Sequence, residues 1–432
     1  MRLAFLRSNE VKNAGWIIGE QIFQMLLSLV VGVLTARYLG PTNYGTLNYT
    51  ASFVSFFMSI ASLGMEGVII KKMIASPQQE GTYLGSCMLL RLLSSLLSMA
   101  AITLLVYLLN PNDTLKVTLV ALQSLQLAFR SVHILDSWFQ RHLKSKYVSL
   151  GKMVAAITVA AYKVFLLITS KSIVWFALSN AFTDLVIALM LFMFYKREHA
   201  QKMQIRFSVG KAVLGESYHF ILSGIVVALY AQMDKIMIGQ MLTDHDVGLY
   251  TTAIAVCGMW VFVPTAVINS FRPKIMELKN AGNEKMYRLR LTQLYSFIIW
   301  LCLAAALFIT FLGKFIIKTL YGDAYLGAVA SLQIAVWFET FSMIGTARGI
   351  WILCENKNKY VKYYLAIGAA VNLVLNTLLI PLWGIEGAAF ATFVTQFVTA
   401  VVSPMLFKET RGHTQIVWDA FICRWWFERR KI

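Results

Sequence analysis

Polar side chains recur at helical spacing inside an otherwise apolar stretch near residue 130. Steps of three and four residues place them on one face of a helix. One of them is an arginine, and a guanidinium can bind phosphate through two parallel hydrogen bonds. Such a stripe is costly to expose to lipid, so we interpret it as a wall of a water-filled cavity. The stripe consists of Gln123, Gln126, Arg130, His133 and Ser137.

Further basic residues lie inside apolar stretches, at several expected depths. Arg91 and Arg348 fall, like Arg130, in the inner half of their stretches, and Lys163 falls in the outer half. Arg37 lies near an outer end, where its side chain could instead extend to the interface. Together these five side chains predict a cavity that accepts an anionic headgroup.

Acidic residues in the same stretches are fewer. Asp184, Asp234 and Glu339 are the candidates for coupling to protons or sodium. Glu20 and Gln24 extend the expected polar cavity surface along the first apolar stretch, at a helical step of four. The alternative for all of these polar positions is hydrogen bonding between packed helices.

The elements that must position these residues follow from the composition. Hydrophobic residues make up 58% of the 432 residues, charged residues only 14%, and the mean hydropathy is +0.65. A soluble domain is about 25% charged. Apolar stretches of about 20 residues can each cross a membrane as a helix. The sequence therefore predicts an all-α integral membrane protein with about twelve spans: 13–38, 45–68, 82–109, 115–138, 149–169, 172–195, 214–241, 247–271, 290–312, 326–352, 362–380 and 385–407.

The net charge of +18 is distributed unevenly among the expected loops. Most of the 39 lysines and arginines fall on one side of the membrane, and lysines favour the cytoplasmic side. We therefore expect both termini to be cytoplasmic. This placement explains the charge better than nucleic-acid binding does, and the basic tail is expected to lie on the anionic inner leaflet. The expected outer loops hold only Lys116, Lys171, Lys314 and Lys318.

The chain carries no recognisable motif for a metal, a cofactor or a phosphate-binding loop. Its five cysteines form no C-x-x-C pair, and we interpret them as small apolar residues. The expected outer loops are short, which argues against a polysaccharide polymerase or ligase. We expect a protein that is not an enzyme and has no cofactor.

An internal repeat divides the chain. Lys-Ser-Lys-Tyr-Val begins at residue 144 and Lys-Asn-Lys-Tyr-Val at residue 357, a separation of 213, and Trp138 and Trp351 share this separation. At a slightly different separation, Leu39 and Gly45 match Leu242 and Gly248. Two six-helix halves of equal topology follow, a plan in which transporters bind substrate between the halves. The expected domains are an N-terminal lobe, a cytoplasmic linker, a C-terminal lobe and a basic cytoplasmic tail, at 1–198, 199–213, 214–407 and 408–432.

Three stretches carry a family resemblance. They are L-G-P-T-N-Y-G after the first span, Q-M-D-K-I-M-I-G-Q-M with G-L-Y-T-T-A at 232–253, and L-I-P-L-W-G-I-E-G-A-A at 379–389. With the two six-span halves, they resemble the O-antigen flippases. These are the polysaccharide biosynthesis members of the multidrug/oligosaccharidyl-lipid/polysaccharide exporter superfamily.

The resemblance implies a flippase for undecaprenyl-pyrophosphate-linked oligosaccharide, moving it from the inner to the outer leaflet by alternating access. It implies a bacterial cytoplasmic (inner) membrane protein of lipopolysaccharide or capsule synthesis. The implied partners are the lipid-linked substrate, membrane lipids, H+ or Na+ and the polymerase machinery. Two alternatives stay open: a multidrug exporter of the same superfamily, which would favour acids in its cavity, and the lipid II flippase, which usually has two further helices.

Overall fold

The computed structural model describes residues 9–424, and the side chains of all of these except residues 9–14, 17 and 18. Within this range every regular element is a helix, which confirms the all-α architecture. By their contacts the residues form two compact units, Met1–Gln232 and Met233–Ile432. The boundary lies inside the helix α9 (Phe207–Met241), beyond the loop that contains residues 199–206. The division of the chain into transport lobes by a linker at 199–213 stays a prediction.

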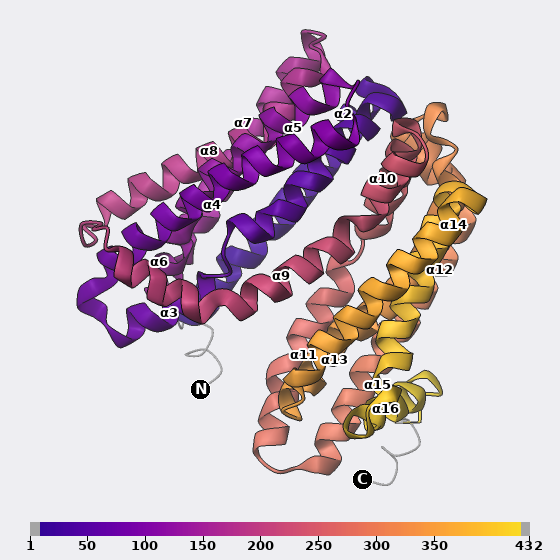
Figure 1. Cartoon of the computed structure of the whole chain (residues 1–432). Coiled ribbons are helices and arrows are strands. Elements are labelled where there is room, and N and C mark those ends of the chain that lie inside the picture. The colour runs from indigo at the N-terminus through magenta and orange to yellow at the C-terminus, as the bar shows by residue number, and fades with distance from the viewer. Residues whose placement is uncertain (1–8, 425–432) are drawn as a thin grey trace. The chain divides into compact units, whose positions relative to one another are not determined.

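The first unit consists of long helices joined by short turns (Figure 1). In it α2 packs against α7 and α5, and α5 packs against α8. Its elements are α2 (Asn9–Ala61), α3 (Glu66–Ala75), η1 (Pro77–Gln79), α4 (Glu80–Leu109), α5 (Thr114–Arg130), η2 (Ser131–Ile134), α6 (Leu135–Arg141), α7 (Ser145–Ile168), α8 (Ile173–Arg197) and most of α9 (Phe207–Met241).

The second unit contains the end of α9 and the remaining helices. Here α13 packs against α10, α12 and α14. The elements are α10 (Asp244–Gly258), α11 (Phe262–Asn280), α12 (Glu284–Tyr321), η3 (Asp323–Tyr325), α13 (Ala328–Cys354), η4 (Asn358–Tyr360), α14 (Val361–Phe397), the π-helical turn η5 (Val398–Val402), α15 (Ser403–Leu406), η6 (Lys408–Thr410) and α16 (Arg411–Phe421).

Two of the long helices are each broken at a glycine. At about 1.5 Å per residue, the 53 residues of α2 would extend to about 80 Å, more than twice the thickness of a hydrocarbon core. It breaks at Gly40 (φ 70°), and α14 breaks at Gly384 (φ 62°), a backbone region that glycine adopts without strain. The described residues contain nine helices that could cross a membrane, or ten with α10 and α11, which meet at a 41° bend. Counting α2 and α14 as two spans each and the α10–α11 pair as one gives twelve spans, the expected number.

Side-chain caps fix where several helices begin. Asp113 accepts a hydrogen bond from the Lys116 backbone N–H and starts α5. Thr243 and Asp246 form a reciprocal capping box at the start of α10. Such caps satisfy backbone donors that the first turn leaves free. They set the ends of the spans that carry the polar residues discussed below.

The repeat is visible in the packing of the two units. Trp138 and Trp351 are both buried, each in the core cluster of its own unit. The Lys-x-Lys-Tyr-Val copies occupy the same place, at the turn into α7 and at the turn into α14. The two halves therefore share a helix plan, as the sequence predicts.

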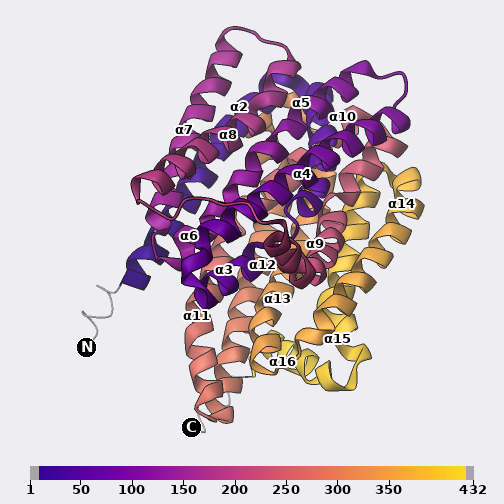
Figure 2. The same ribbon diagram turned by 60° about the vertical axis from the view of Figure 1, so that its left-hand side comes forward.

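The segment between α8 and α9 folds back along the end of the first unit (Figure 2). The Gly81 N–H donates to Gln201 Oε1 (3.2 Å), and the Gln204 N–H donates to the Gly81 carbonyl (3.2 Å). A Cβ at Gly81 would lie 2.3 Å from the Lys202 carbonyl oxygen, and one at Gly85 would lie 2.5 Å from that of Gln204. Glycine is thus required for this approach, and residues 201–206 belong to the first unit.

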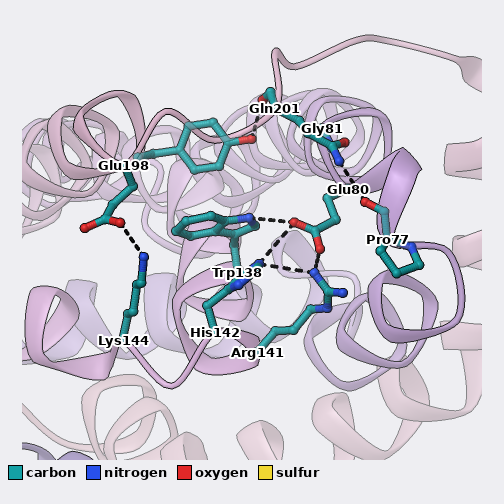
Figure 3. Close-up of polar contacts among 10 residues, drawn as sticks. Pro77, Glu80, Gly81, Trp138, Arg141, His142, Lys144, Glu198 and Gln201 are labelled. Carbon is teal, nitrogen blue, oxygen red and sulfur yellow. Dashed lines mark hydrogen bonds and ion pairs between the residues drawn. The ribbon is translucent and has the colours of Figure 1, made fainter.

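A buried carboxylate ties the same end of the unit together (Figure 3). Glu80 accepts hydrogen bonds from Trp138 Nε1 (2.8 Å) and His142 Nε2 (3.2 Å) and pairs with Arg141. Trp138 and Arg141 lie in α6, and His142 follows it directly. The Glu80 side chain therefore joins the start of α4 to the segment that leads from α6 to α7.

The first part of the expected basic tail is structured. Residues 411–421 form α16, which packs against α12, and residues 425–432 lie outside the described residues. His413 is fully buried, and its Nε2 lies 2.8 Å from the Tyr295 hydroxyl. Burial, and secondarily Arg348, hold the pKa of His413 well below its usual value. The docked helix therefore favours the neutral imidazole.

We expect α16 to detach more readily as the pH falls from about 7 to about 5. A released histidine titrates near its usual pKa of about 6.5, so docking is fully stable above that value and weakens by at most about tenfold per pH unit below it. Hydrogen exchange of the α16 peptide at the two pH values measures this. His413→Gln should remove the pH dependence and His199→Gln, at an exposed position, should keep it; an unchanged profile in His413→Gln contradicts the assignment.

Candidate functional site

The first unit brings Arg91 and Arg130 together. Both line one small cavity of about 10 Å³, with Ser62 and Ser95 beside them. Such a volume holds about one water molecule. Arg91 is only 2% exposed, and its Nε and Nη1 have no hydrogen-bond partner. A buried guanidinium with free donors is costly unless a ligand supplies acceptors.

Each arginine also faces a carboxylate from another helix. Arg91 Nη2 lies 3.7 Å from Glu66 Oε1 of α3, and Arg130 Nη1 lies 3.7 Å from Asp184 Oδ1 of α8. Both distances exceed those of a charge-assisted hydrogen bond, about 2.7–2.9 Å. The carboxylates therefore balance the charge of the arginines without occupying all of their donors.

The helix that carries Arg130 is interrupted directly after it. Residues 131–134 form the 3₁₀ turn η2, and α6 continues the span. His133 within this turn lies 3.6 Å from Asp184 Oδ1, measured from its Nε2. Asp136 Oδ1 is buried without a partner. Short 3₁₀ segments within a span mark places where a helix can change its pairing, and this one lies beside both arginines.

The other members of the expected stripe face protein. Gln123 is 1% exposed and donates from Nε2 to the Leu47 carbonyl (3.0 Å), which ties α5 to α2. Gln126 and Ser137 are also buried. For Gln123 this contact supports the alternative of hydrogen bonding between helices, and the cavity role of all three stays a prediction.

Lys163 lies in a different pocket of the first unit. Residues of α2, α7 and α8 line this pocket of about 240 Å³, and Gln24, Ser28, Asn180 and Thr183 contribute its polar lining. Gln24 also lies within 3.4 Å of the Lys152 carbonyl through its Nε2. Glu20, on the same helix as Gln24, is buried. The structure thus separates Lys163 and Gln24 from the cavity of the two arginines.

Asp234 is the centre of a polar cluster in the second unit. Its Oδ1 accepts from Asn376 Nδ2 (2.7 Å), and its Oδ2 accepts from the hydroxyls of Tyr250 (2.5 Å) and Thr392 (2.7 Å). Asn376 also donates to Asn372 Oδ1 (3.1 Å). Asn376 Oδ1 is buried without a partner. Two hydroxyl oxygens thus contact a carboxylate, and oxygen atoms are the ligands that a hard cation prefers.

Sequence reasoning identified Asp234 but none of its partners. Thr392 and Asn376 lie 158 and 142 residues away in the chain. One signal was available: Asn372 and Asn376 stand four residues apart within an apolar span, and therefore share a helix face. Nothing in the sequence shows which helix they face.

The remaining expected site residues lie apart from these groups. Arg348 donates from Nη1 to the Thr399 carbonyl in the π-helical turn and lies 4.5 Å from the centre of the Tyr364 ring. Glu339 is half-buried on the same helix, with no ion pair to Arg348 among the described residues. Arg37 is exposed in the first unit. Their roles with substrate or ions stay predictions.

The chain shares its fold with solved structures of a flippase and of a multidrug transporter. The chain matches a lipid II flippase, MurJ, in an inward closed conformation, with a TM-score of 0.72 at 16% identity over 94% of this chain and 90% of that one. It also matches an inward-facing multidrug resistance MATE transporter with a TM-score of 0.69 at 13% identity, over 92% of this chain and 96% of the other. At these identities the likeness concerns the fold, which is that of the multidrug/oligosaccharidyl-lipid/polysaccharide exporters.

A family model narrows this class. The model for polysaccharide biosynthesis proteins matches residues 11–270, which is more than half of the chain. The chain belongs to the polysaccharide biosynthesis protein family, and the resemblance seen in its sequence is confirmed.

Several curated relatives are named as flippases or transporters. A putative O-antigen transporter of Salmonella typhi is 22% identical over 50% of this chain, and a probable low-salt glycan biosynthesis flippase of Haloferax volcanii is 22% identical over 85% of this chain and 77% of its own. The lipid II flippase of Bacillus subtilis is 21% identical over 96% of this chain and 84% of its own. The chain spans only 54% of the Salmonella protein and 37% of a second probable flippase of Haloferax volcanii.

Proposed function

We propose that the protein is a flippase for an undecaprenyl-pyrophosphate-linked oligosaccharide, a unit of O-antigen, capsule or another surface polysaccharide. It would carry this lipid from the inner to the outer leaflet of the bacterial cytoplasmic membrane by alternating access, with both termini in the cytoplasm. The two arginines of the first unit would hold the pyrophosphate in a state of the transport cycle in which their cavity is wider than the 10 Å³ of this structure.

The observation that carries this proposal is the burial of Arg91 without hydrogen-bond partners, among the described residues, for two of its nitrogens. Its guanidinium is buried, two of its nitrogens lack partners, and Arg130 shares its cavity. Two guanidinium groups can bind a pyrophosphate by donating parallel, charge-assisted hydrogen bonds to its oxygens. The family membership and the names of the relatives support a glycan-linked lipid as the source of that anion.

Deletion of the gene in its own host tests the proposal. Surface polysaccharide is examined by gel, and lipid-linked oligosaccharide is assayed by leaflet. We expect loss of the surface glycan with the lipid intermediate retained in the inner leaflet, and restoration by the wild-type gene. Normal surface glycan with increased sensitivity to cationic dyes would overturn the proposal in favour of a multidrug exporter.

One observation favours a second candidate, the lipid II flippase. This chain covers 84% of the length of a curated lipid II flippase and 90% of that of a solved lipid II flippase. Lipid II carries the same pyrophosphate chemistry, so the site in the first unit serves either substrate. Sequencing the glycan on the retained lipid intermediate distinguishes the two candidates.

We propose that Asp234 carries the coupling ion, a proton or sodium, and that Asp184 is a second, weaker candidate in the first unit. Asp234 has three donors and several oxygen neighbours, whereas Asp184 faces Arg130 and His133. A carboxylate that already balances an arginine is a poorer cation site. Glu339, the third acid expected to couple, has no such cluster among the contacts of the described residues.

Asp234→Asn is therefore expected to lower ion-driven flipping by about tenfold or more, because the charge that holds the ion is lost. Transport of a fluorescent lipid-linked glycan into proteoliposomes, with sodium and pH varied independently, measures the loss and identifies the ion. Tyr250→Phe removes one hydrogen bond, about 1 kcal/mol, and serves as the matched control. Ion dependence that persists unchanged in Asp234→Asn would contradict the role of Asp234.

A further inference from the structure

The first helix of each half can be aligned across the repeat. Leu39 matches Leu242, and the same register places the buried Thr35 opposite the buried Ile238. One helical turn earlier, Val31 stands where Asp234 stands. Asp234 is the carboxylate of the second unit's cluster, and Val31 lines the Lys163 pocket of the first unit.

The fifth helix of each half aligns as well. The Lys-x-Lys-Tyr-Val copies fix a separation of 213, and burial follows it: Ala155 and Gly368 are both buried, and so are Val159 and Asn372. The next step of four residues brings Lys163 opposite Asn376. Steps of four residues thus place the three α7 members of these pairs on one face of α7, and the three α14 members on one face of α14.

The sixth helix completes the correspondence. Ile173 matches Ile385 and Ala177 matches Ala389, all four buried, at a separation of 212. In this register Asn180 stands where Thr392 stands. The pocket in the first unit is thus the counterpart of the Asp234 cluster in the second. Four pocket residues, Val31, Val159, Lys163 and Asn180, occupy the positions of Asp234, Asn372, Asn376 and Thr392.

The charge at these equivalent positions is inverted. The second unit has one carboxylate among neutral oxygen and nitrogen groups. The first unit has valine in place of that carboxylate, and an ammonium in place of the asparagine that contacts it. No carboxylate is among the residues that line the pocket, and no ion pair of Lys163 occurs in the described part of the chain.

We propose that the Lys163 pocket is a binding site for a phosphate-class anion. A charged ammonium within a membrane span is costly without a counter-charge, and the pocket offers no carboxylate. Its volume of about 240 Å³ corresponds to several water molecules and is large enough for a phosphate group. Gln24, Ser28, Asn180 and Thr183 add neutral hydrogen-bonding groups around the ammonium. The halves thus hold equivalent sites for ions of opposite sign.

This inference goes beyond the proposed flippase activity, because anion binding here does not depend on lipid movement. The anion could be free in solution or the headgroup of an isoprenoid lipid. The test therefore uses the purified full chain in detergent and two probes, inorganic pyrophosphate and farnesyl diphosphate. Acetylation of individual lysines is followed by peptide mass spectrometry, which reports on Lys163 itself.

We expect pyrophosphate, farnesyl diphosphate or both to slow acetylation of Lys163 by about tenfold, since a charge-assisted contact must be broken for reaction. Lys314, at an exposed position, is the internal control and should react equally with and without either probe. Protection by farnesyl diphosphate alone identifies a lipid headgroup site, and protection by pyrophosphate identifies a site open to free anions. Protection of Lys163 by neither probe overturns the inference.

Exchange of residues between the halves provides a second measurement. Lys163→Asn places the residue of the second half in the pocket. The affinity for the probe, measured from the rise in unfolding temperature as the probe is added, should fall by about tenfold in Lys163→Asn and stay unchanged in Lys163→Arg. The double variant Val31→Asp with Lys163→Asn should respond to the ion of the second half, sodium or a proton, instead of the anion. If Lys163→Asn is stabilised as strongly as the wild type, the pocket does not bind the anion.

Discussion

Arg91→Gln is expected to reduce flipping by about a hundredfold, because loss of a desolvated charge pair costs about 2–5 kcal/mol. Arg130→Gln should have an effect of the same order, since both side chains line one cavity. The measurement is restoration of surface glycan in the deletion strain, at matched protein levels, with flipping rates from proteoliposomes. Arg288→Gln, which changes a side chain that is 73% exposed, is the charge-matched control and should restore the glycan fully.

Double variants separate substrate binding from charge balance. Arg91 lies opposite Glu66, so a purely structural arginine could be compensated by also replacing that carboxylate. We expect Arg91→Gln with Glu66→Gln to stay inactive, because the pyrophosphate still lacks its donor. Recovery of transport in this double variant would falsify the binding role of Arg91 and leave it as a neutralising residue.

Glu80→Ala is expected to lower the free energy of unfolding by about 3–5 kcal/mol, the usual cost of removing one partner of a buried ion pair. Glu80 is 5% exposed, accepts hydrogen bonds from Trp138 and His142 and forms an ion pair with Arg141 (Figure 3). Its removal leaves three donors without their acceptor. Unfolding of the purified protein by titration with SDS measures the change.

The Lys144–Glu198 pair, drawn in the same view, is the matched control (Figure 3). The Lys144 ammonium holds the pKa of Glu198 below its usual value, yet the lysine side chain is 40% exposed. Exposed pairs contribute about 0–1 kcal/mol. Glu198→Ala should therefore have little effect, and a loss equal to that of Glu80→Ala would contradict the special status of Glu80.

The architecture was predictable because its signals are local. The length of each apolar stretch predicts a membrane span, and the two Lys-x-Lys-Tyr-Val copies indicate the repeat. Neither prediction requires knowledge of how the helices pack. The breaks at Gly40 and Gly384 were predictable only as the ends of expected spans. The amide, hydroxyl and charged residues of the stripes could be placed on helix faces, because helical periodicity is fixed at 3.6 residues per turn.

The grouping of site residues was not predictable, because it depends on which helix faces which. Arg91 and Arg130 share a cavity, whereas Lys163, expected in the same group, lies in another pocket. Gln123 was expected to face water, and it donates to the backbone of α2. Periodicity gives the direction of a side chain from its own helix axis, and the rotation of each helix relative to its neighbours comes from packing alone.

The segment that folds back onto α4 has a practical consequence for labelling the protein. Residues 201–206 form the obvious surface loop between the halves, and a fluorescent protein or affinity tag would usually be inserted there. Their backbone is held against Gly81 and Gly85, so an insertion would push apart the end of the first unit. The turn between α11 and α12, where Gly282 has open space around it, is the safer place for a reporter.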